Sequence, residues 1–325
     1  MTIPFPITVY LVAAFSAAVV TALSLPLWRR RCISFGLVDD PGHRKIHDAP
    51  IPLAGGLAVF TGMLLPLLAG IAVGLAVHHS DTVSLFEYGL NRRAIQLLGI
   101  FTGALGMLLL GLADDWMELP PATKFGGQFL VALIVAACGV RITLFVPNIL
   151  FSYAITILWI LTLVNAFNFM DNMNGLCAGL GAIAAILFAS ISAASGQYLV
   201  ATIAFVGAGA LIGFLPSNYP RATAFLGDAG SHLIGFLLAV LAILPHFYTA
   251  KHPHTWAVFK PLLVLSVPLG DLCWVVLIRW RAGKPFYIGD NNHLSHRLVR
   301  RGLSPKSAVA LIWLIAIAIG LIALL

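Results

Sequence analysis

The sequence carries acidic residues in positions where they could bind a metal ion and phosphate groups. Asp114 and Asp115 are adjacent in the segment GLADDWMELP. Adjacent carboxylates repel each other, and the pKa of one rises unless a cation lies beside them. Mg²⁺ is usually held by one or two carboxylates together with substrate phosphates. The pair therefore indicates a metal–phosphate site, and a solvated helix end is the alternative.

The segment FLGDAGSHLIGF favours phosphate binding as well. Asp228 is predicted to be the N-cap of a helix, with Ser231 three residues further on. The small residues Gly227, Ala229 and Gly230 leave backbone N–H groups open, and a helix N-terminus attracts phosphate. A plain capped helix start is the alternative. A second acidic cluster on the same side of a membrane would favour a role for Asp228 in binding a metal or a diphosphate.

The segment NAFNFMDNMNGL places four amides and an acid at the end of an apolar run. Asn165, Asn168 and Asn172 share one helical face, and Asp171 follows Asn168 by three residues. Buried amides need hydrogen-bond partners. Contacts between helices are the alternative role, with Asn174 in the turn that follows.

Two basic loops could hold anions. In DDPGHRKIHDAPIPLAGG, the cationic set of Arg44, Lys45 and His47 suits phosphate, and contact with lipid headgroups is the alternative. In IGDNNHLSHRLVRRGLS, His293 and His296 are three residues apart on a predicted helix face, close to Arg297 and Arg300. The segment lacks the further ligands that would complete a zinc site with these two histidines. Binding of an anionic donor, or acid chemistry on phosphate, fits better than a surface pair of histidines.

Asp271 is the one acid expected within a membrane span. Acids inside a membrane are functional candidates. Pro268 and Gly270 precede it and could break the helix. A supporting role near the site and a buried pair with Arg279 both stay open.

These side chains must be positioned by helices that cross a membrane. The chain has 325 residues, of which 60% are hydrophobic and 10% charged, whereas about a quarter are charged in soluble domains. Long apolar runs predict an all-α, polytopic membrane protein of about ten spans forming a single transmembrane domain, residues 1–325. The predicted spans are 5–27, 53–77, 95–113, 125–140, 150–167, 175–193, 197–215, 231–248, 258–280 and 307–325.

The charges predict which side of the membrane holds the site. Alternating the loops puts 14 of the 19 Lys and Arg residues on one side, which the positive-inside rule makes cytoplasmic, with both termini external. Acids contribute little to topology. Nine of the twelve acids nevertheless fall on that side, namely Asp39, Asp40, Asp48, Asp114, Asp115, Glu118, Asp171, Asp228 and Asp290. This distribution predicts a polar site in the inner (plasma) membrane that opens to the cytoplasm.

Other compositional features exclude some classes of function. The net charge of +7 reflects topology and contact with anionic lipid, so no nucleic-acid partner is expected. The four cysteines are scattered without CxxC spacing and are expected to be packed thiols. The sequence leaves a homodimer open.

Taken together, the motifs resemble those of the polyprenyl-phosphate N-acetylhexosamine-1-phosphate transferase family, called glycosyltransferase family 4 in older naming, in its undecaprenyl-phosphate N-acetylglucosamine-1-phosphate transferase branch. They occur in family order over nearly the whole chain. The matching positions are Asp40-Pro41, Arg44-Lys45, His47, Pro50, Pro52, Gly55-Gly56, Asp114-Asp115, Asn165, Asn168, Asp171, Gly175-Leu176, Gly227-Asp228, Gly230-Ser231, Asp271, His293 and His296-Arg297-Leu298.

The resemblance implies transfer of a sugar-1-phosphate from a UDP-N-acetylhexosamine to undecaprenyl phosphate, with Mg²⁺ or Mn²⁺ as cofactor and UMP as the second product. The expected product begins a cell-envelope glycan such as lipopolysaccharide or teichoic acid. The implied catalytic residues are Asp114, Asp115, Asp171, His293 and His296; the metal ligands are Asp228 and Asp115; the substrate-binding residues are Lys45, His47, Asn165, Asn168, Asp171 and Arg297.

Two positions depart from the family pattern. Asn174 stands in place of the usual second acid after Asp171. The asparagine side chain keeps an acceptor oxygen but lacks the negative charge of that acid. Ser295 stands where many relatives have a histidine, which favours the glycan-initiating branch over the peptidoglycan enzyme phospho-N-acetylmuramoyl-pentapeptide transferase.

Two other classes of protein remain as alternatives. An ion-coupled transporter would have acids near the bilayer midplane, and Asp271 is the only acid expected at such a position. A non-catalytic lipid-binding relative is supported only by Asn174.

Overall fold

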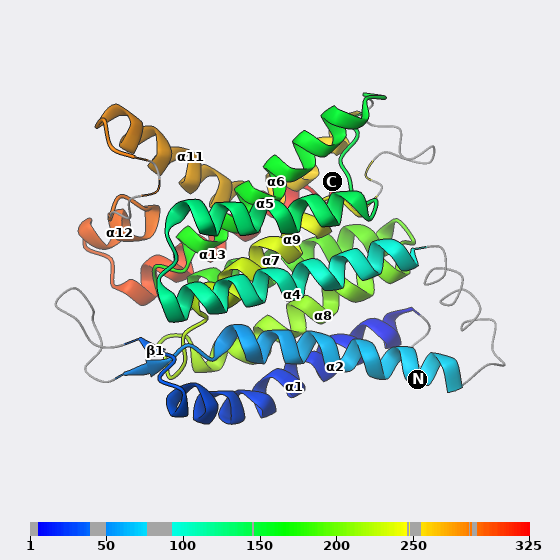
Figure 1. The fold of residues 1–325 in the computed structure, drawn as a ribbon, viewed down its shortest axis with the longest axis horizontal. Coiled ribbons are helices and arrows are strands. Elements are labelled where there is room, and N and C mark those ends of the chain that lie inside the picture. The colour runs from blue at the N-terminus through cyan, green and yellow to red at the C-terminus, as the bar shows by residue number, and fades with distance from the viewer. Residues whose placement is uncertain are drawn as a thin grey trace.

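The apolar runs form helices, because a chain in lipid must satisfy its backbone hydrogen bonds internally. The computed structural model describes residues 6–39, 50–76, 93–144, 146–245, 247, 255–285, 287 and 291–325. Figure 1 shows a bundle of helices with one small sheet. The elements are α1 (Ile7–Ser34), β1 (Val38–Asp39), β2 (Ile51–Pro52), α2 (Gly55–Ala76), α4 (Ala94–Met117), α5 (Pro121–Ala137), α6 (Ile149–Met170), α7 (Leu176–Ala194), α8 (Tyr198–Phe214), η1 (Leu215–Ser217), α9 (Gly227–Leu241), η2 (Thr255–Phe259), α10 (Lys260–Val264), α11 (Ser266–Arg281), α12 (Leu294–Arg300) and α13 (Pro305–Ile322).

Within the described residues, seven helices are long and apolar enough to cross a membrane, and α10 with α11 would make an eighth span if the bent pair counts as one. The protein is therefore an all-α, multi-pass membrane protein, as predicted. Helices α5 and α9 correspond to the other two predicted spans but are shorter, with 17 and 15 residues. The count of ten spans stays a prediction.

The predicted span 258–280 is divided. The segment Trp256–Val264, which contains most of η2 and all of α10, meets α11 at a 75° bend. Pro268 lies in the first turn of α11. Its nitrogen cannot donate to the carbonyl of Val264, so a continuous helix would be broken there. The predicted break therefore exists, and it falls at Leu265, three residues before the proline.

Helix α9 is the central element of the bundle. It packs against α2, α4, α6, α7 and α8, and Figure 1 shows it in the interior behind α4. Apart from the half-buried Asp228, each of its residues is buried. A short helix can therefore stay inside the bundle, because its neighbours cover it on all sides.

The polar end of the bundle is held by backbone contacts between distant loops. Strands β1 and β2 pair antiparallel, with Val38 opposite Pro52. The carbonyl of Pro52 accepts from Phe225 N, and Gly55 N donates to the carbonyl of Phe225. These bonds place the beginning of α2 against the loop that leads into α9.

Two glycines let α9 approach its neighbours closely. A Cβ at Gly111 of α4 would collide with the backbone of Asp228 and Ala229, and a Cβ at Gly56 of α2 would collide with the backbone of Gly230. Helices that associate in a membrane use small residues in this way. The first turn of α9 is therefore in contact with two other helix backbones.

We predict that Gly111→Ala destabilises the protein by about 1–3 kcal/mol, because the added methyl group overpacks a backbone contact. Thermal unfolding of the purified protein in detergent measures the change. Gly70→Ala in α2 is the matched control, since a Cβ there meets nothing within 4 Å. Equal melting temperatures for the two variants would contradict the close approach of α4 and α9.

Candidate active site

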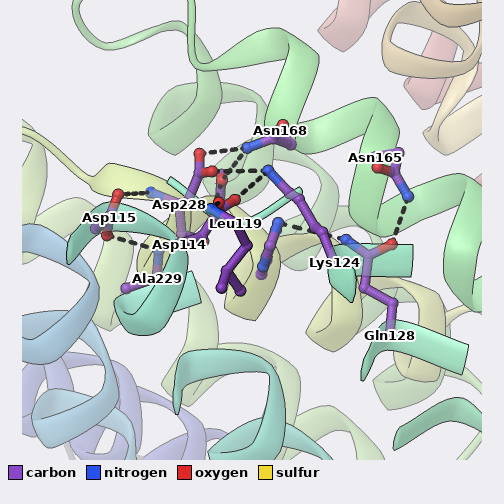
Figure 2. A network of polar contacts seen from close by, with 11 residues as sticks. Asp114, Asp115, Leu119, Lys124, Gln128, Asn165, Asn168, Asp228 and Ala229 are labelled. Carbon is purple, nitrogen blue, oxygen red and sulfur yellow. Dashed lines mark hydrogen bonds and ion pairs between the residues drawn. The ribbon is translucent and has the colours of Figure 1, made fainter. Parts of the chain in front are cut away.

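An ion-paired cluster forms where α4, α5 and α9 meet at the polar end of the bundle. The Lys124 Nζ lies 2.6 Å from Asp114 Oδ2 and 2.7 Å from Asp228 Oδ2, as Figure 2 shows. The lysine is in the first turn of α5, directly after the Pro120–Pro121 corner that ends the connection from α4. Asp114 also accepts from Leu119 N at 2.8 Å. The cluster thus joins three helices and closes the end of α4.

Asp115 caps α9 from another helix. Its two carboxylate oxygens accept from Asp228 N at 2.7 Å and from Ala229 N at 3.1 Å. The prediction that Asp228 is the N-cap is wrong, because α9 begins at Gly227 and Asp228 lies inside its first turn. A carboxylate near a helix N-terminus is favourable. The metal-binding role of Asp115 stays a prediction.

Amides extend the cluster into the bundle. Asn168 Nδ2 donates to Asp228 Oδ1 at 2.6 Å and to Ser231 Oγ at 3.0 Å. Asn165 Nδ2 donates to Gln128 Oε1 at 2.7 Å. Of the two predicted substrate-binding amides of α6, Asn168 therefore contacts Asp228 directly, whereas Asn165 contacts Gln128 (Figure 2).

A cavity of about 1580 Å³ opens above the cluster. Its walls bring together most of the predicted site residues. The predicted residues that line it are Asp114, Asp115, Asn165, Asn168, Asp171, Asp228 and His296.

Asp171 follows α6 and lines the cavity. Burial raises the pKa of Asp171 to about 8, and the negative charges of Asp228 and Asp115 act in the same direction. Asp114 and Asp228 contact the Lys124 ammonium, and the carboxyl groups of Asp115 and Asp171 line the same cavity. The surplus negative charge favours binding of a further cation.

The donor set at the floor fits a divalent cation. Asp114, Asp228 and His232 each offer one ligand atom, and these atoms lie within 4.8 Å of one another. Carboxylate and amide oxygens are ligands that Mg²⁺ accepts, usually together with water and phosphate. Asp228 and the neighbouring Asn168 both line the cavity beside this group.

Asp271 fixes the histidine segment to α11. His293 is the N-cap residue of α12 and is buried, and its Nδ1 lies 2.7 Å from Asp271 Oδ2. The other oxygen of Asp271 accepts from Leu294 N at 2.6 Å. Both oxygens of Asp271 are therefore used at the start of α12. His293 is absent from the residues that line the cavity, so its catalytic role stays a prediction.

The predicted residues His296 and Arg297 differ in their position relative to the cavity. His296 lines the cavity. Arg297 stacks on Trp274, with its Cζ 4.6 Å from the ring centroid, and is not among the cavity-lining residues. The predicted substrate-binding residues Lys45 and His47 lie outside the described residues.

The two departures from the family pattern both make hydrogen bonds. Asn174 Nδ2 donates to Pro220 O at 3.3 Å, which a carboxylate could not do. Ser295 Oγ donates to Asn172 Oδ1 at 2.6 Å. These bonds connect the segment after α6 to the loop before α9 on one side and to α12 on the other.

Sequence reasoning missed three residues of the site: Lys124, Gln128 and His232. Lys124 entered only as a topological charge. Lys124 and Gln128 are four residues apart, so they share one face of an apolar helix, and Asp228 and His232 have the same spacing. That repeated spacing of polar residues in apolar runs is the signal that could have found them.

The fold and the site together define a polytopic membrane protein with an acidic cluster, able to hold a cation, in a cavity between helix ends. Comparison with known proteins agrees. A sequence model of glycosyl transferase family 4 matches residues 97–246. The chain belongs to this family, and the family prediction is confirmed.

Relatives match over most of their length. A probable undecaprenyl-phosphate N-acetylglucosaminyl 1-phosphate transferase of Bacillus subtilis is 31% identical over 314 residues, covering 94% of this chain and 82% of the relative. A decaprenyl-phosphate N-acetylglucosaminephosphotransferase of Mycobacterium tuberculosis is 33% identical and covers 95% and 80%. An undecaprenyl-phosphate alpha-N-acetylglucosaminyl 1-phosphate transferase of Salmonella typhi is 28% identical and covers 91% and 78%.

We predict that Asp115→Asn loosens the first turn of α9. The amide keeps one acceptor oxygen but places N–H groups against a backbone donor, which costs about 1 kcal/mol. Hydrogen–deuterium exchange of peptides that span Asp228 and Ala229 should become faster. Glu118→Gln is the control, because Glu118 is an exposed acid at the same helix end. Unchanged protection at residues 228–229 would contradict the capping role.

Proposed function

We propose that this protein transfers an N-acetylhexosamine-1-phosphate from a UDP-sugar to undecaprenyl phosphate, giving undecaprenyl-diphospho-N-acetylhexosamine and UMP, with Mg²⁺ as cofactor. The observation that carries this proposal is the cluster of Asp114, Lys124 and Asp228 at the floor of a cavity with both polar and apolar walls. The names of the relatives support N-acetylglucosamine as the default sugar. The product would begin a cell-envelope glycan.

The apolar wall of the cavity suits a lipid acceptor. Leu158 and Leu161 of α6 face the cavity together with Leu272 and Val276 of α11. Leu158 is 62% exposed and therefore accessible from the surrounding lipid. A prenyl chain that lies along these side chains would bring its phosphate toward the floor from the membrane side.

The polar wall suits a nucleotide diphosphate. Arg221 and Lys306 are exposed cations on the cavity wall. Asn218 and Tyr219 lie beside them, and Tyr219 Oη donates to the carbonyl of Lys306 at 3.0 Å. Cations at the rim attract the diphosphate electrostatically and raise its rate of association.

Catalysis of the transfer depends mainly on positioning the two phosphate groups and neutralising their negative charge. An oxygen of the lipid phosphate attacks the phosphorus that carries the sugar, and the phosphoanhydride bond breaks so that its electron pair leaves on UMP. The lipid phosphate is already largely ionised near neutral pH, so removing its proton is a small demand. Bound Mg²⁺ would neutralise charge on the diphosphate.

In this scheme Lys124 and the acids have distinct tasks. The ammonium of Lys124 offsets the charge where two anions must approach each other. Asp228 and Asn168 would hold the metal through oxygen atoms, Asp114 orients Lys124, and Asp115 holds the first turn of α9 in place.

The sidedness of the site belongs to the same proposal. The excess of Lys and Arg in the loops at the polar end of the bundle favours a cytoplasmic cavity in the inner membrane, with external termini. A UDP-sugar made in the cytosol would then enter directly.

The structure weakens the transporter alternative. Asp271, the only acid that supported it, is bound to His293 and to the N-terminus of α12 at the polar end. The peptidoglycan alternative is less supported than the N-acetylglucosamine branch named by the relatives.

We predict that Asp114→Asn and Asp228→Asn each lower transfer by about 10²-fold or more, because each leaves the Lys124 charge incompletely compensated and Asp228→Asn also replaces a carboxylate ligand. Release of UMP that depends on Mg²⁺ and undecaprenyl phosphate measures the reaction. Both variants should still insert into the membrane. Glu87→Gln is the control, because Glu87 is not among the nine acids that the sequence places on the cytoplasmic side. Near-wild-type transfer by either variant would overturn the assignment.

We predict that Asn174→Asp raises the KM for the UDP-sugar by about three- to tenfold. The carboxylate cannot donate to Pro220 O, and it adds negative charge where the diphosphate enters. Asn174→Ala removes the donor without adding charge, so it separates the two effects. The KM values of the three proteins at two salt concentrations are the measurement; a lower KM for Asn174→Asp would contradict the expectation.

A further inference from the structure

A second cavity, of about 710 Å³, lies at the polar end of the bundle and shares no lining residue with the candidate active site. This α1–α4 groove is lined by side chains from residues 28–37 and 112–117 and by Leu57 of α2. Helix α2 packs against both α1 and α4, and Figure 1 shows it between them. Ligand-binding cavities have about 300–1,000 Å³, so the groove has room for a ligand.

The walls of the α1–α4 groove are largely apolar. Trp28, Cys32 and Phe35 follow one another along α1 and its C-cap at spacings of four and three residues, so they share one helix face. Trp116 of α4 lines the groove as well and is 70% exposed. Trp28 Nε1 donates to Thr61 Oγ1 at 3.0 Å. Because this is the only donor of the indole, the rest of the ring offers carbon surface. Such walls suit a hydrocarbon chain.

Arg31 is the one charged residue that lines the groove within the described part of the chain. It lies in the last turn of α1, three residues after Trp28 on the same helix face, and is exposed. Among the described residues it forms no ion pair with an acid. A guanidinium binds phosphate through two parallel hydrogen bonds. Basic pockets between membrane helices bind anionic lipid headgroups.

We propose that the α1–α4 groove binds one anionic phospholipid, with an acyl chain along Trp28 and Trp116 and the phosphate on Arg31. Charge complementarity selects this occupant. The apolar walls alone would accept the chain of any lipid, whereas the guanidinium favours a headgroup with a net negative charge. The site lies outside the active-site cavity, so lipid binding does not depend on the transferase assignment.

Native mass spectrometry of the purified protein, titrated with dioleoylphosphatidylglycerol, measures the Kd of the first bound lipid. Dioleoylphosphatidylcholine has the same chains without net charge, and we expect it to bind about fivefold more weakly. Arg31→Gln should weaken binding of phosphatidylglycerol by about the same factor and remove the preference between the two lipids. Arg30→Gln is the matched control, because Arg30 is also exposed but does not line the groove. It should keep the preference.

Ala113→Phe tests the apolar part of the site. Ala113 lines the groove from α4, so the added ring takes space that the acyl chain needs. Binding of both lipids should weaken by about tenfold, the loss expected when two methylene groups are no longer buried. Arg31→Gln changes an exposed side chain, so its result stands even if Ala113→Phe does not fold.

Three results would overturn the proposal. Equal affinity for the two phospholipids would remove the selection by charge. Equal losses in Arg30→Gln and Arg31→Gln would leave only a general attraction to the basic end of α1. Tighter binding of undecaprenyl phosphate than of phosphatidylglycerol, weakened by Arg31→Gln, would assign the groove to a prenyl lipid instead. None of these results depends on UMP release, so a failure of the proposed function would leave the lipid site in place.

Discussion

The ion pairs that Lys124 makes with Asp114 and Asp228 are the interaction on which the rest of the site depends. They lie among apolar helices, where an uncompensated charge is costly and removal of one partner leaves another unpaired. The side chains are 17%, 7% and 32% exposed, in the order Lys124, Asp114 and Asp228. The cluster is thus buried enough to hold α4, α5 and α9 together and open enough for a ligand to reach it from the cavity.

Two acids stabilise helix ends that belong to other parts of the chain. Asp115 binds the first N–H groups of α9, and Asp271 binds the first N–H group of α12 while it also holds His293. Helix N-termini have unsatisfied donors, and a carboxylate supplies both acceptors and a favourable charge. Using these two acids in this way leaves Asp114 and Asp228, which contact Lys124, to provide the negative charge of the cavity.

The sequence predicted the helices and the acidic site, because both depend on signals that can be read locally. Apolar runs of membrane length predict helices, and acids gathered on one side of the membrane predict a shared site. Capping across the bundle was not predictable. The partner of Asp115 lies 113 residues away, and those of Lys124 and Gln128 lie 104 residues away, whereas capping rules connect residues within one turn. The local rule therefore assigned the N-cap of α9 to Asp228, while the acid that caps it came from α4.

The departures from the family pattern fit a site whose charge is already in surplus. Asp171 has a raised pKa because of burial and its acidic neighbours, and a further acid at position 174 would add to the same repulsion. An amide at that position donates to Pro220 O instead, and Ser295 donates to Asn172. Neutral hydrogen bonds thus fix the segment that carries Asp171 on both sides without adding charge. The loss of one acid is therefore compatible with catalysis, since the acids that contact Lys124 and the start of α9 are retained.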